Sequence, residues 1–216
     1  MLIEICGPDG AGKTTLVDAL RARLRAATGV AVYERVLRSE SRNLLEVARL
    51  SASASFTQRE MTLAVLLDAV RQSTGEFSTY VGSPVMHIVV QHYAHTLAAR
   101  LRDEGLHLDP GLRWLLSRLP PPDVSVRLAI TPTRCMERIR ARAKGDDILT
   151  AAEPGERMRR LVESFENAAA DLTYPQFVVD AAQDVPSVLK ATWWHVQAVA
   201  GVTIQMETGY GSETGR

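Results

Sequence analysis

The chain has 216 residues, 46% of them hydrophobic, which is enough for one domain with a substantial core. Its 25 lysines and arginines balance its 25 aspartates and glutamates, so the net charge gives no reason to expect a nucleic acid or an anionic membrane as partner. The two cysteines, Cys6 and Cys135, match neither a disulfide framework nor a metal site, and a reduced, cytoplasmic protein is expected.

The N-terminus runs directly into a predicted strand, without the basic leader and apolar run of a signal peptide. Apolar runs elsewhere stay well short of the roughly 20 residues that would span a bilayer. We therefore expect neither a signal peptide nor a membrane segment.

The first motif is a glycine-rich stretch between a predicted strand and a predicted helix. Residues 2–6 have the character of a short buried strand, and residues 15–24 have the apolar spacing of a helix. A glycine, four free positions and Gly-Lys-Thr form the pattern of a phosphate-binding loop. The stretch consists of Gly7, Pro8, Asp9, Gly10, Ala11, Gly12, Lys13, Thr14 and Thr15.

Each part of this loop has a physical role in holding a polyphosphate. Glycines at positions 7, 10 and 12 let the backbone curl so that its N–H groups point inward. Lys13 can reach the β and γ phosphates, and the Thr14 hydroxyl can bind Mg²⁺. The N-terminus of the helix adds partial positive charge. The context therefore favours a site for ATP and Mg²⁺ over a glycine turn in an unrelated α/β protein.

The stretch after the first helix predicts a second strand and a first group of binding residues. Residues 29–36 alternate like a strand and complete a right-handed βαβ unit of a parallel sheet. Arg38 follows the carboxyl end of this strand, where it can meet an anion or remain a solvated loop residue. Phe56 and Arg59 begin a predicted helix over residues 57–72 and could grip a planar, anionic ligand. Burial in the core is the alternative for Phe56.

The middle of the chain predicts a third strand over residues 76–81 and a long helix over residues 85–102. His92 and His95 would share one face of this helix, a spacing that metals sometimes use. Cys, Asp and Glu residues that would complete a ligand set are missing nearby, so a packing or surface role is favoured. A further helical pattern over residues 106–119 ends at a proline-rich turn.

The last part of the chain predicts two more strands, at 124–130 and 176–180, with helices between and after them. The helix after the first of these strands carries Arg138 and Arg142 on a shared side. A charged loop over about 142–156 follows, which is either a solvated surface segment or a lid that closes over ATP. The lid is favoured because the chain already has a phosphate cradle.

These elements predict an α/β fold of the P-loop NTPase type. We expect a parallel sheet of about five strands with helices on both faces and a short lid. Residues 1–204 would form a single domain, whose lid lies at about 142–156. Residues 205–216 have little to bury and are expected to be a disordered tail.

The order of these parts resembles the thymidylate kinases and, more widely, the nucleoside monophosphate kinases, over about residues 1–200. An aspartate before Gly-Ala-Gly-Lys is typical of thymidylate kinases, and the resemblance implies that Asp9 lies beside the substrate sugar and the transferred phosphate. Arg38 falls where the family has an arginine that holds the acceptor phosphate. Phe56 and Arg59 fall near the family's base-stacking aromatic residue and its base or phosphate arginine.

The resemblance extends to the ATP side of the site. Residues 138–142 resemble the family's Arg-Ile-x-x-Arg before the lid. Because the loop has Ala11 where other members have an arginine, the lid would supply the arginine, through Arg138 and Arg142. Residues 180–184 lie where the family's loop meets the adenine ring. Members are commonly homodimers, and the resemblance implies a homodimer here.

One departure concerns the family's Asp-Arg-Tyr signature after the third strand. It is placed here on Ser78, Thr79 and Tyr80, and the Ala-Tyr-Gln that follows it is placed on residues 86–88. Tyr80 would then remain as a substrate-binding residue. The missing arginine should weaken monophosphate binding by about one to two orders of magnitude, unless Arg38, Arg59 or Arg71 compensates.

The residues support a hypothesis of ATP-dependent phosphoryl transfer to a nucleoside monophosphate, giving the diphosphate and ADP. The acceptor would be dTMP or a modified analogue, and the catalytic residues would be Asp9, Lys13, Arg138 and Arg142. Two alternatives stay open. One is a kinase for another small metabolite, and the other is a non-catalytic nucleotide-binding regulator, in which the altered signature reflects lost transfer chemistry.

Overall fold

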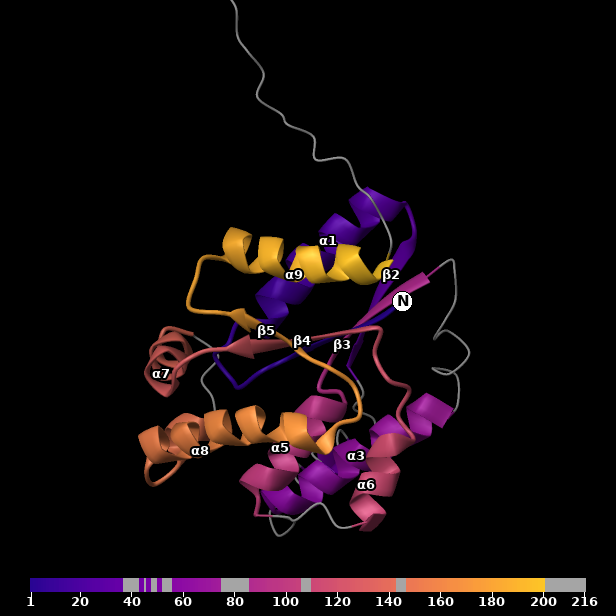
Figure 1. Cartoon of the computed structure of the whole chain (residues 1–216). Helices are drawn as coiled ribbons and strands as arrows, with labels where there is room; N and C mark the ends of the chain where they lie inside the picture. Colours follow the sequence, from indigo (N-terminus) through magenta and orange to yellow (C-terminus); the bar gives the residue numbers. More distant parts are fainter. Residues whose placement is uncertain are drawn as a thin grey trace, which may run out of the picture.

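A computed structural model of the chain describes residues 1–36, 43–44, 46–47, 50–51, 56–74, 86–105, 110–142 and 147–200. Within these residues, a parallel sheet of five strands lies between two layers of helices (Figure 1). The strand order is β2-β3-β1-β4-β5, and every neighbouring pair is parallel. The predicted α/β fold with a parallel sheet and helices on both faces is confirmed.

The five strands are β1 (Leu2–Cys6), β2 (Ala31–Val36), β3 (Met86–Gln91), β4 (Val124–Ala129) and β5 (Phe177–Asp180). The α-helices used below are α1 (Lys13–Thr28), α3 (Gln58–Thr74), α5 (Ala94–Asp103), α6 (Pro110–Ser117), α7 (Pro132–Arg140), α8 (Pro154–Asn167) and α9 (Val185–Ala200). Two short 3₁₀ helices flank α8, and they are η1 (Asp147–Thr150) and η2 (Ala168–Asp171).

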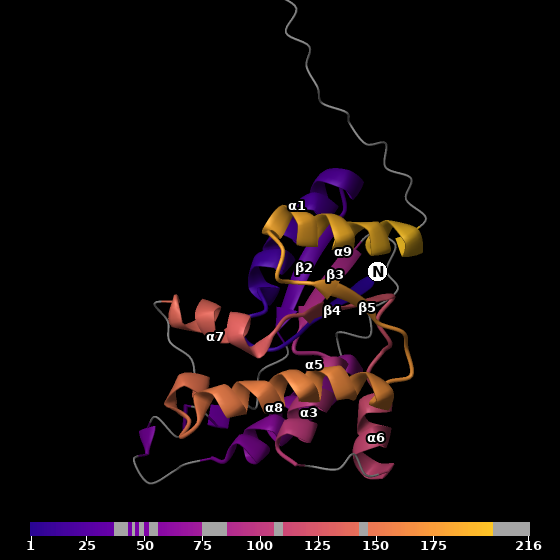
Figure 2. The same cartoon turned by 60° about the vertical axis from the view of Figure 1, so that its left-hand side comes forward.

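The helices divide between the two faces of the sheet. Helices α1 and α9 pack together on one face, and α5 and α8 pack together on the other with α3 and α6 (Figures 1 and 2). Strand β1 runs through the centre and is buried over its whole length. Central strands of parallel sheets are covered on both faces, which explains its nearly continuous apolar sequence.

Beneath the centre of the sheet, the carboxylate of Glu4 is fully buried and joins three other segments. It accepts hydrogen bonds from the backbone N–H of His95 (2.9 Å), the hydroxyl of Ser125 (2.8 Å) and the hydroxyl of Tyr174 (2.9 Å). Burial raises the pKa of Glu4, and these hydrogen bonds oppose that change. The carboxylate therefore ties β1 to α5, to β4 and to the segment before β5.

The structure corrects the prediction for the middle of the chain. Residues 86–91, predicted as the start of a long helix, form β3, which pairs with both β1 and β2. The predicted strand over residues 76–81 lies outside the described residues. A short apolar run cannot be assigned to a buried strand or a buried helix by periodicity alone, and the branched residues Ile88, Val89 and Val90 settle in the sheet, where they are almost fully buried.

This correction separates the two histidines that were predicted to share a helix face. His92 lies between β3 and α5 with a φ of 56°, whereas His95 lies inside α5 and is fully buried. The His95 ring stacks on Phe165, and its Nε2 is 2.8 Å from the Phe165 carbonyl oxygen. Burial lowers the pKa of His95 to about 4, so the ring is neutral at pH 7. His95 therefore has a packing role between α5 and α8.

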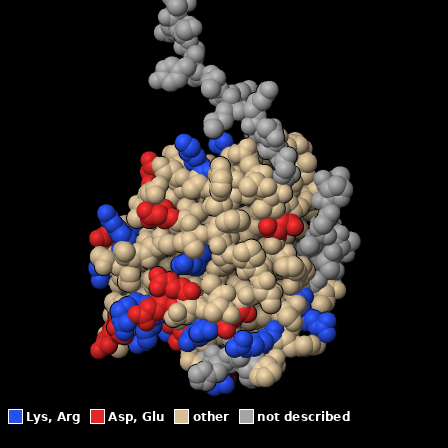
Figure 3. Space-filling view, in the orientation of Figure 1, with Lys and Arg blue, Asp and Glu red and all other residues tan. Residues whose placement is uncertain are grey.

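The outer surface of α8 is rich in charge of both signs, as the lower part of Figure 3 shows. Ion pairs connect residues along the helix, with Arg159 meeting both Glu156 and Glu163. Exposed pairs of this kind contribute little to stability and mainly keep the surface solvated. Among the described residues, no helix combines the length and the apolar character that a bilayer-spanning helix needs.

Candidate nucleotide-binding site

The glycine-rich loop connects the buried end of β1 to the start of α1. Gly7, Gly10 and Gly12 have φ values of 148°, 88° and 92°, which are unfavourable for other residues. Gly10 also lies tightly against α7, since a Cβ atom there would be 2.7 Å from the carbonyl oxygen of Cys135. The loop therefore needs glycine both for its curvature and for its close contact with a neighbouring helix.

Lys13 folds back over this loop and is 9% exposed. Its Nζ donates hydrogen bonds to the carbonyl oxygens of Gly7 (2.8 Å) and Pro8 (3.0 Å). The amine thus lies over the concave side of the loop, at the N-terminus of α1, where an anion would gain from both the lysine and the helix dipole. This arrangement fits a polyphosphate, whose oxygens would replace the two carbonyls as acceptors.

Asp9 stands at the edge of the loop between two cationic side chains. One oxygen of its carboxylate is 3.4 Å from Lys13 Nζ, and the other is 3.9 Å from Arg100 Nη2 on α5. Burial acts to raise the pKa of Asp9, but Lys13, Arg100 and His92 together outweigh it and lower the pKa to about 2. Asp9 is therefore ionised at neutral pH.

Arg138 joins the loop to the β5 side of the sheet. Its guanidinium donates to the carbonyl oxygens of Ala11 (3.4 Å) and Ala181 (2.8 Å), and Ala181 follows β5 directly. The predicted lid arginine is thus anchored against the loop, next to the segment that was expected to meet adenine. Arg142 lies just beyond the end of α7 and is exposed.

The predicted lid over about 142–156 is described only in part. Residues 143–146 lie outside the described residues, η1 covers Asp147–Thr150, and α8 begins at Pro154. Ile148 is 7% exposed and belongs to the hydrophobic core. The 3₁₀ helix η1 therefore packs against the body of the protein, in contact with α8.

Only two of the residues predicted to bind the acceptor, besides Asp9, lie within the described residues. Arg38 and Tyr80 lie outside the described residues. Phe56 is half-buried just before α3, and Arg59 is exposed in the first turn of that helix. Their roles in binding stay predictions. On the described residues, then, the loop, Asp9 and Arg138 come together, and α5 adds Arg100, which the sequence had not singled out.

Comparison with known proteins decides the family. A family model described as an AAA domain matches residues 3–159. A thymidylate kinase of Xanthomonas euvesicatoria pv. vesicatoria (strain 85-10) is 31% identical over 222 residues, covering 100% of this chain and 91% of that protein. The chain belongs to the thymidylate kinase family. Thymidylate kinases of Xanthomonas oryzae pv. oryzae (strain PXO99A) and Xylella fastidiosa (strain 9a5c) are 30% and 28% identical, over 100% and 94% of this chain and 91% and 94% of those proteins.

Membership of the thymidylate kinase family confirms the resemblance that the loop and its flanks indicated. It supports nucleotide kinase activity with nucleotide binding at the loop. In this family ATP is the co-substrate and Mg²⁺ is generally required, and the curled loop with Lys13 and Thr14 has the donor groups that both need.

The corrected position of β3 also moves the thymidylate kinase signature. If the Asp-Arg-Tyr signature lies at the end of the third strand, it would fall on Gln91, His92 and Tyr93, where β3 ends, instead of residues 78–80. The tyrosine would then be retained, and the hydroxyl of Tyr93 donates to the Pro120 carbonyl oxygen at 2.7 Å. On this placement, Gln91 and His92 would stand where the signature has its aspartate and arginine.

The second motif of the family moves with the first. If the interval between the two motifs is kept, Ala-Tyr-Gln would fall on residues 99–101, with the alanine retained and Arg100 in place of the tyrosine. The sequence alone could therefore have pointed to Arg100, but only if the branched residues 88–90 had first been assigned to a strand.

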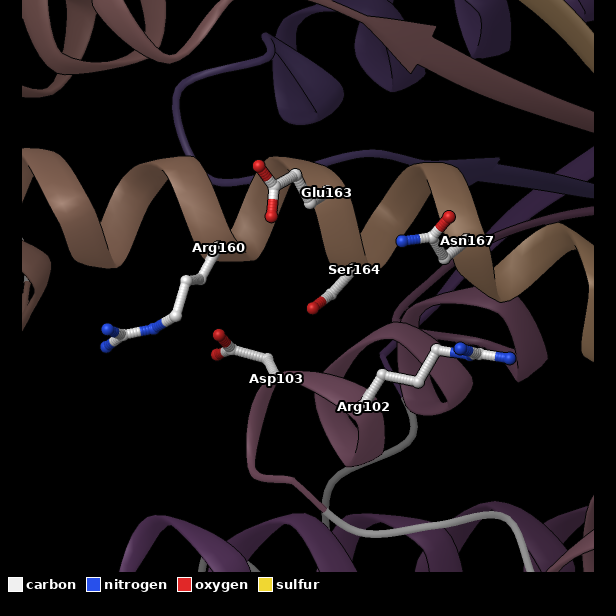
Figure 4. A pocket seen from close by; sticks show the side chains of 6 residues that line it. All are labelled: Arg102, Asp103, Arg160, Glu163, Ser164 and Asn167. Carbon is white, nitrogen blue, oxygen red and sulfur yellow. The ribbon is translucent and has the colours of Figure 1, made fainter.

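A separate cavity of about 240 Å³ lies between α5 and α8. Its wall carries side chains of both charges from the two helices (Figure 4). Those side chains are Arg102, Asp103, Arg160, Glu163, Ser164 and Asn167. Asp103 is paired with Arg157 at 2.8 Å, so the charges of this wall are largely balanced within the protein. None of the loop residues that would hold a phosphate lines this cavity.

Proposed function

We propose that this protein transfers the γ-phosphoryl group of ATP to the phosphate of a nucleoside monophosphate, either dTMP or a modified analogue. The observation that carries the proposal is the ionised Asp9 carboxylate, held between Lys13 of the loop and Arg100 of α5. Lys13 would serve the phosphates of ATP, and Arg100 supplies a second cation, beside the same carboxylate, that a second phosphorylated substrate could meet.

In the proposed reaction, the β and γ phosphates of ATP lie against the N–H groups of the loop. Lys13 turns its amine from the carbonyl oxygens of Gly7 and Pro8 to the phosphate oxygens. An acceptor phosphate oxygen forms a bond to the γ phosphorus, and the bond to the β–γ bridging oxygen breaks, which yields ADP and the nucleoside diphosphate. The acceptor oxygen is already ionised at neutral pH, so alignment and charge stabilisation suffice.

Two further groups support this chemistry. Arg142, near the start of the proposed lid, would neutralise charge that develops on the transferred group, while Arg138 holds the loop beside the segment after β5. Mg²⁺ would offset charge between the β and γ phosphates, and the Thr14 hydroxyl, with Asp9 nearby, would hold it.

The family resemblance supports three wider proposals. The domain would span residues 1–204 with its lid at about 142–156, the protein would work in the cytoplasm, and it would be a homodimer. Analytical ultracentrifugation of the full chain tests the last of these.

The experiment is an assay of ADP and nucleoside diphosphate formation from Mg-ATP. The acceptors are dTMP, dUMP, 5-substituted dUMP analogues, other nucleoside monophosphates and unphosphorylated nucleosides. Turnover of a monophosphate, lost in Lys13→Ala, supports the proposal. Turnover of nucleosides alone would favour a kinase for another metabolite, and bound ATP without ADP release under any acceptor would favour a regulator.

A further inference from the structure

The two sides of β1 offer different partners to a nucleotide in the loop. On one side lie β4, β5 and α7, from which Arg138 bridges the loop and the segment after β5. On the other side lies β3, followed by His92 and by α5 with Arg100. If ATP extends from the loop toward the β5 side, the acceptor must approach from the β3 side.

Arg100 is the cation that meets the loop from this second side. Its side chain is 29% exposed, and its Nη2 lies 3.9 Å from Asp9 Oδ2, which is beyond hydrogen-bond distance. Charge attraction to Asp9 therefore keeps the guanidinium near the loop, but the two side chains do not form a bidentate hydrogen-bonded pair. It can turn its donor groups toward an incoming anion while staying close to Asp9.

The position of Arg100 could also compensate for the missing signature arginine. On the placement at the end of β3, His92 stands at the position of the signature arginine, which the resemblance implies grips the acceptor phosphate, and Arg100 stands at the position of a tyrosine of the next motif. His92 and Arg100 both lie close enough to Asp9 to act on its charge. On this placement, a guanidinium has been lost at position 92 and another gained at position 100 around the same carboxylate.

We propose that Arg100 binds the phosphate of the acceptor in place of the signature arginine. This inference rests on the proposed function, since it names the residue that recognises the monophosphate. It replaces the expectation that Arg38, Arg59 or Arg71 would compensate. It also predicts an acceptor that carries an anionic group where the transferred phosphoryl arrives, which favours a nucleotide over an unphosphorylated nucleoside.

The test is equilibrium binding, measured by calorimetry on the full chain. Thymidine and dTMP form one matched pair of probes, and deoxyuridine and dUMP form another, each pair differing only in the phosphate. The variants are Arg100→Gln, which removes the charge, and Arg100→Lys, which keeps it. Arg159→Gln, on the exposed surface of α8, is the matched control.

We expect wild type to bind at least one monophosphate more tightly than its nucleoside. Arg100→Gln should reduce that phosphate-dependent gain by about 10- to 100-fold, with nucleoside and Mg-ATP affinities unchanged. Arg100→Lys should restore part of the gain, and Arg159→Gln should match wild type. Thermal denaturation of each variant shows whether a loss of binding comes from unfolding.

Three outcomes separate this inference from the proposed function. Unchanged monophosphate binding in Arg100→Gln would overturn the inference, even where wild type transfers phosphate normally. Arg100-dependent binding without any ADP release would support the inference and contradict the proposed function. A wild-type protein that binds neither monophosphate more tightly than its nucleoside would overturn the inference, whatever its binding of ATP.

Discussion

The β5 side and the β3 side of the phosphate loop differ in how closely they follow the family pattern. On the β5 side, Arg138 is predicted to match an arginine of the family, and it contacts both the loop and the segment after β5. On the β3 side, the proposed placement puts Gln91, His92 and Arg100 at positions where the family has other residues. The first side faces ATP in the proposed reaction, and the second faces the acceptor. We therefore expect the residues that decide which acceptor binds to lie on the β3 side.

Loss of Lys13 should lower activity most, because this residue serves both sides of the site. Lys13→Ala removes the cation over the loop, and we expect phosphoryl transfer to fall by a factor on the order of 10³ or more. Steady-state ADP release measures it, with Lys190→Ala on α9 as control. A variant that retains near wild-type turnover would show that the loop does not hold the reacting phosphates.

A change on the β5 side should affect ATP alone. Arg138→Ala removes the link between Ala11 and Ala181, and we expect KM for ATP to rise by about 10- to 100-fold, as for loss of a charge-assisted contact. KM for the acceptor should stay within about twofold of wild type. If the acceptor KM rises as much as that of ATP, the division of the site into two sides is wrong.

Acid should destabilise the helix under the β3 side. The pKa of His95 is lowered to about 4 by burial, from an ordinary value of 6.5, so the unfolded chain takes up a proton first as pH falls. The contribution of neutral His95 to the free energy of unfolding is complete above pH 6.5. It decreases as pH falls from 6.5 to 4, and at pH 5 the decrease is about 2 kcal/mol.

Urea denaturation of wild type and His95→Gln from pH 7 to 4.5 measures this contribution. Glutamine keeps the backbone N–H that binds Glu4 and can still donate to the Phe165 carbonyl oxygen. The raised pKa of Glu4 acts in the opposite direction in both proteins, so only their difference reports His95. If the free energy of unfolding depends on pH in the same way in both proteins, His95 does not make this contribution.

A smaller change in monophosphate affinity should show whether an arginine at position 92 can replace Arg100. His92→Arg restores the signature arginine, and in an Arg100→Gln background we expect it to recover about tenfold in monophosphate affinity. The same change in the wild-type background should add little, because Arg100 already meets the phosphate. Calorimetry with dTMP and dUMP measures both. A double variant no better than Arg100→Gln would show that position 92 cannot reach the acceptor.

The sequence was sufficient for the fold and for the loop, because a phosphate cradle demands glycines, a lysine and a flanking strand and helix in a narrow pattern. The third strand was missed because its short apolar run suits a buried helix equally well. Arg100 was missed for the same reason, since its place in the family pattern depends on where β3 ends. The contact of Arg138 with Ala181 needed the strand order, which brings β5 beside β4.

The close contact between Gly10 and Cys135 has a mechanical consequence. The loop has no free space on that side, since even a Cβ atom would meet the backbone of α7 at 2.7 Å. A movement of the loop toward α7 would press directly on the helix backbone at Cys135. Helix α7 ends at Arg140, close to where the chain leaves for the proposed lid. We therefore expect a change in the loop on filling of the ATP site to reach the base of the lid through α7.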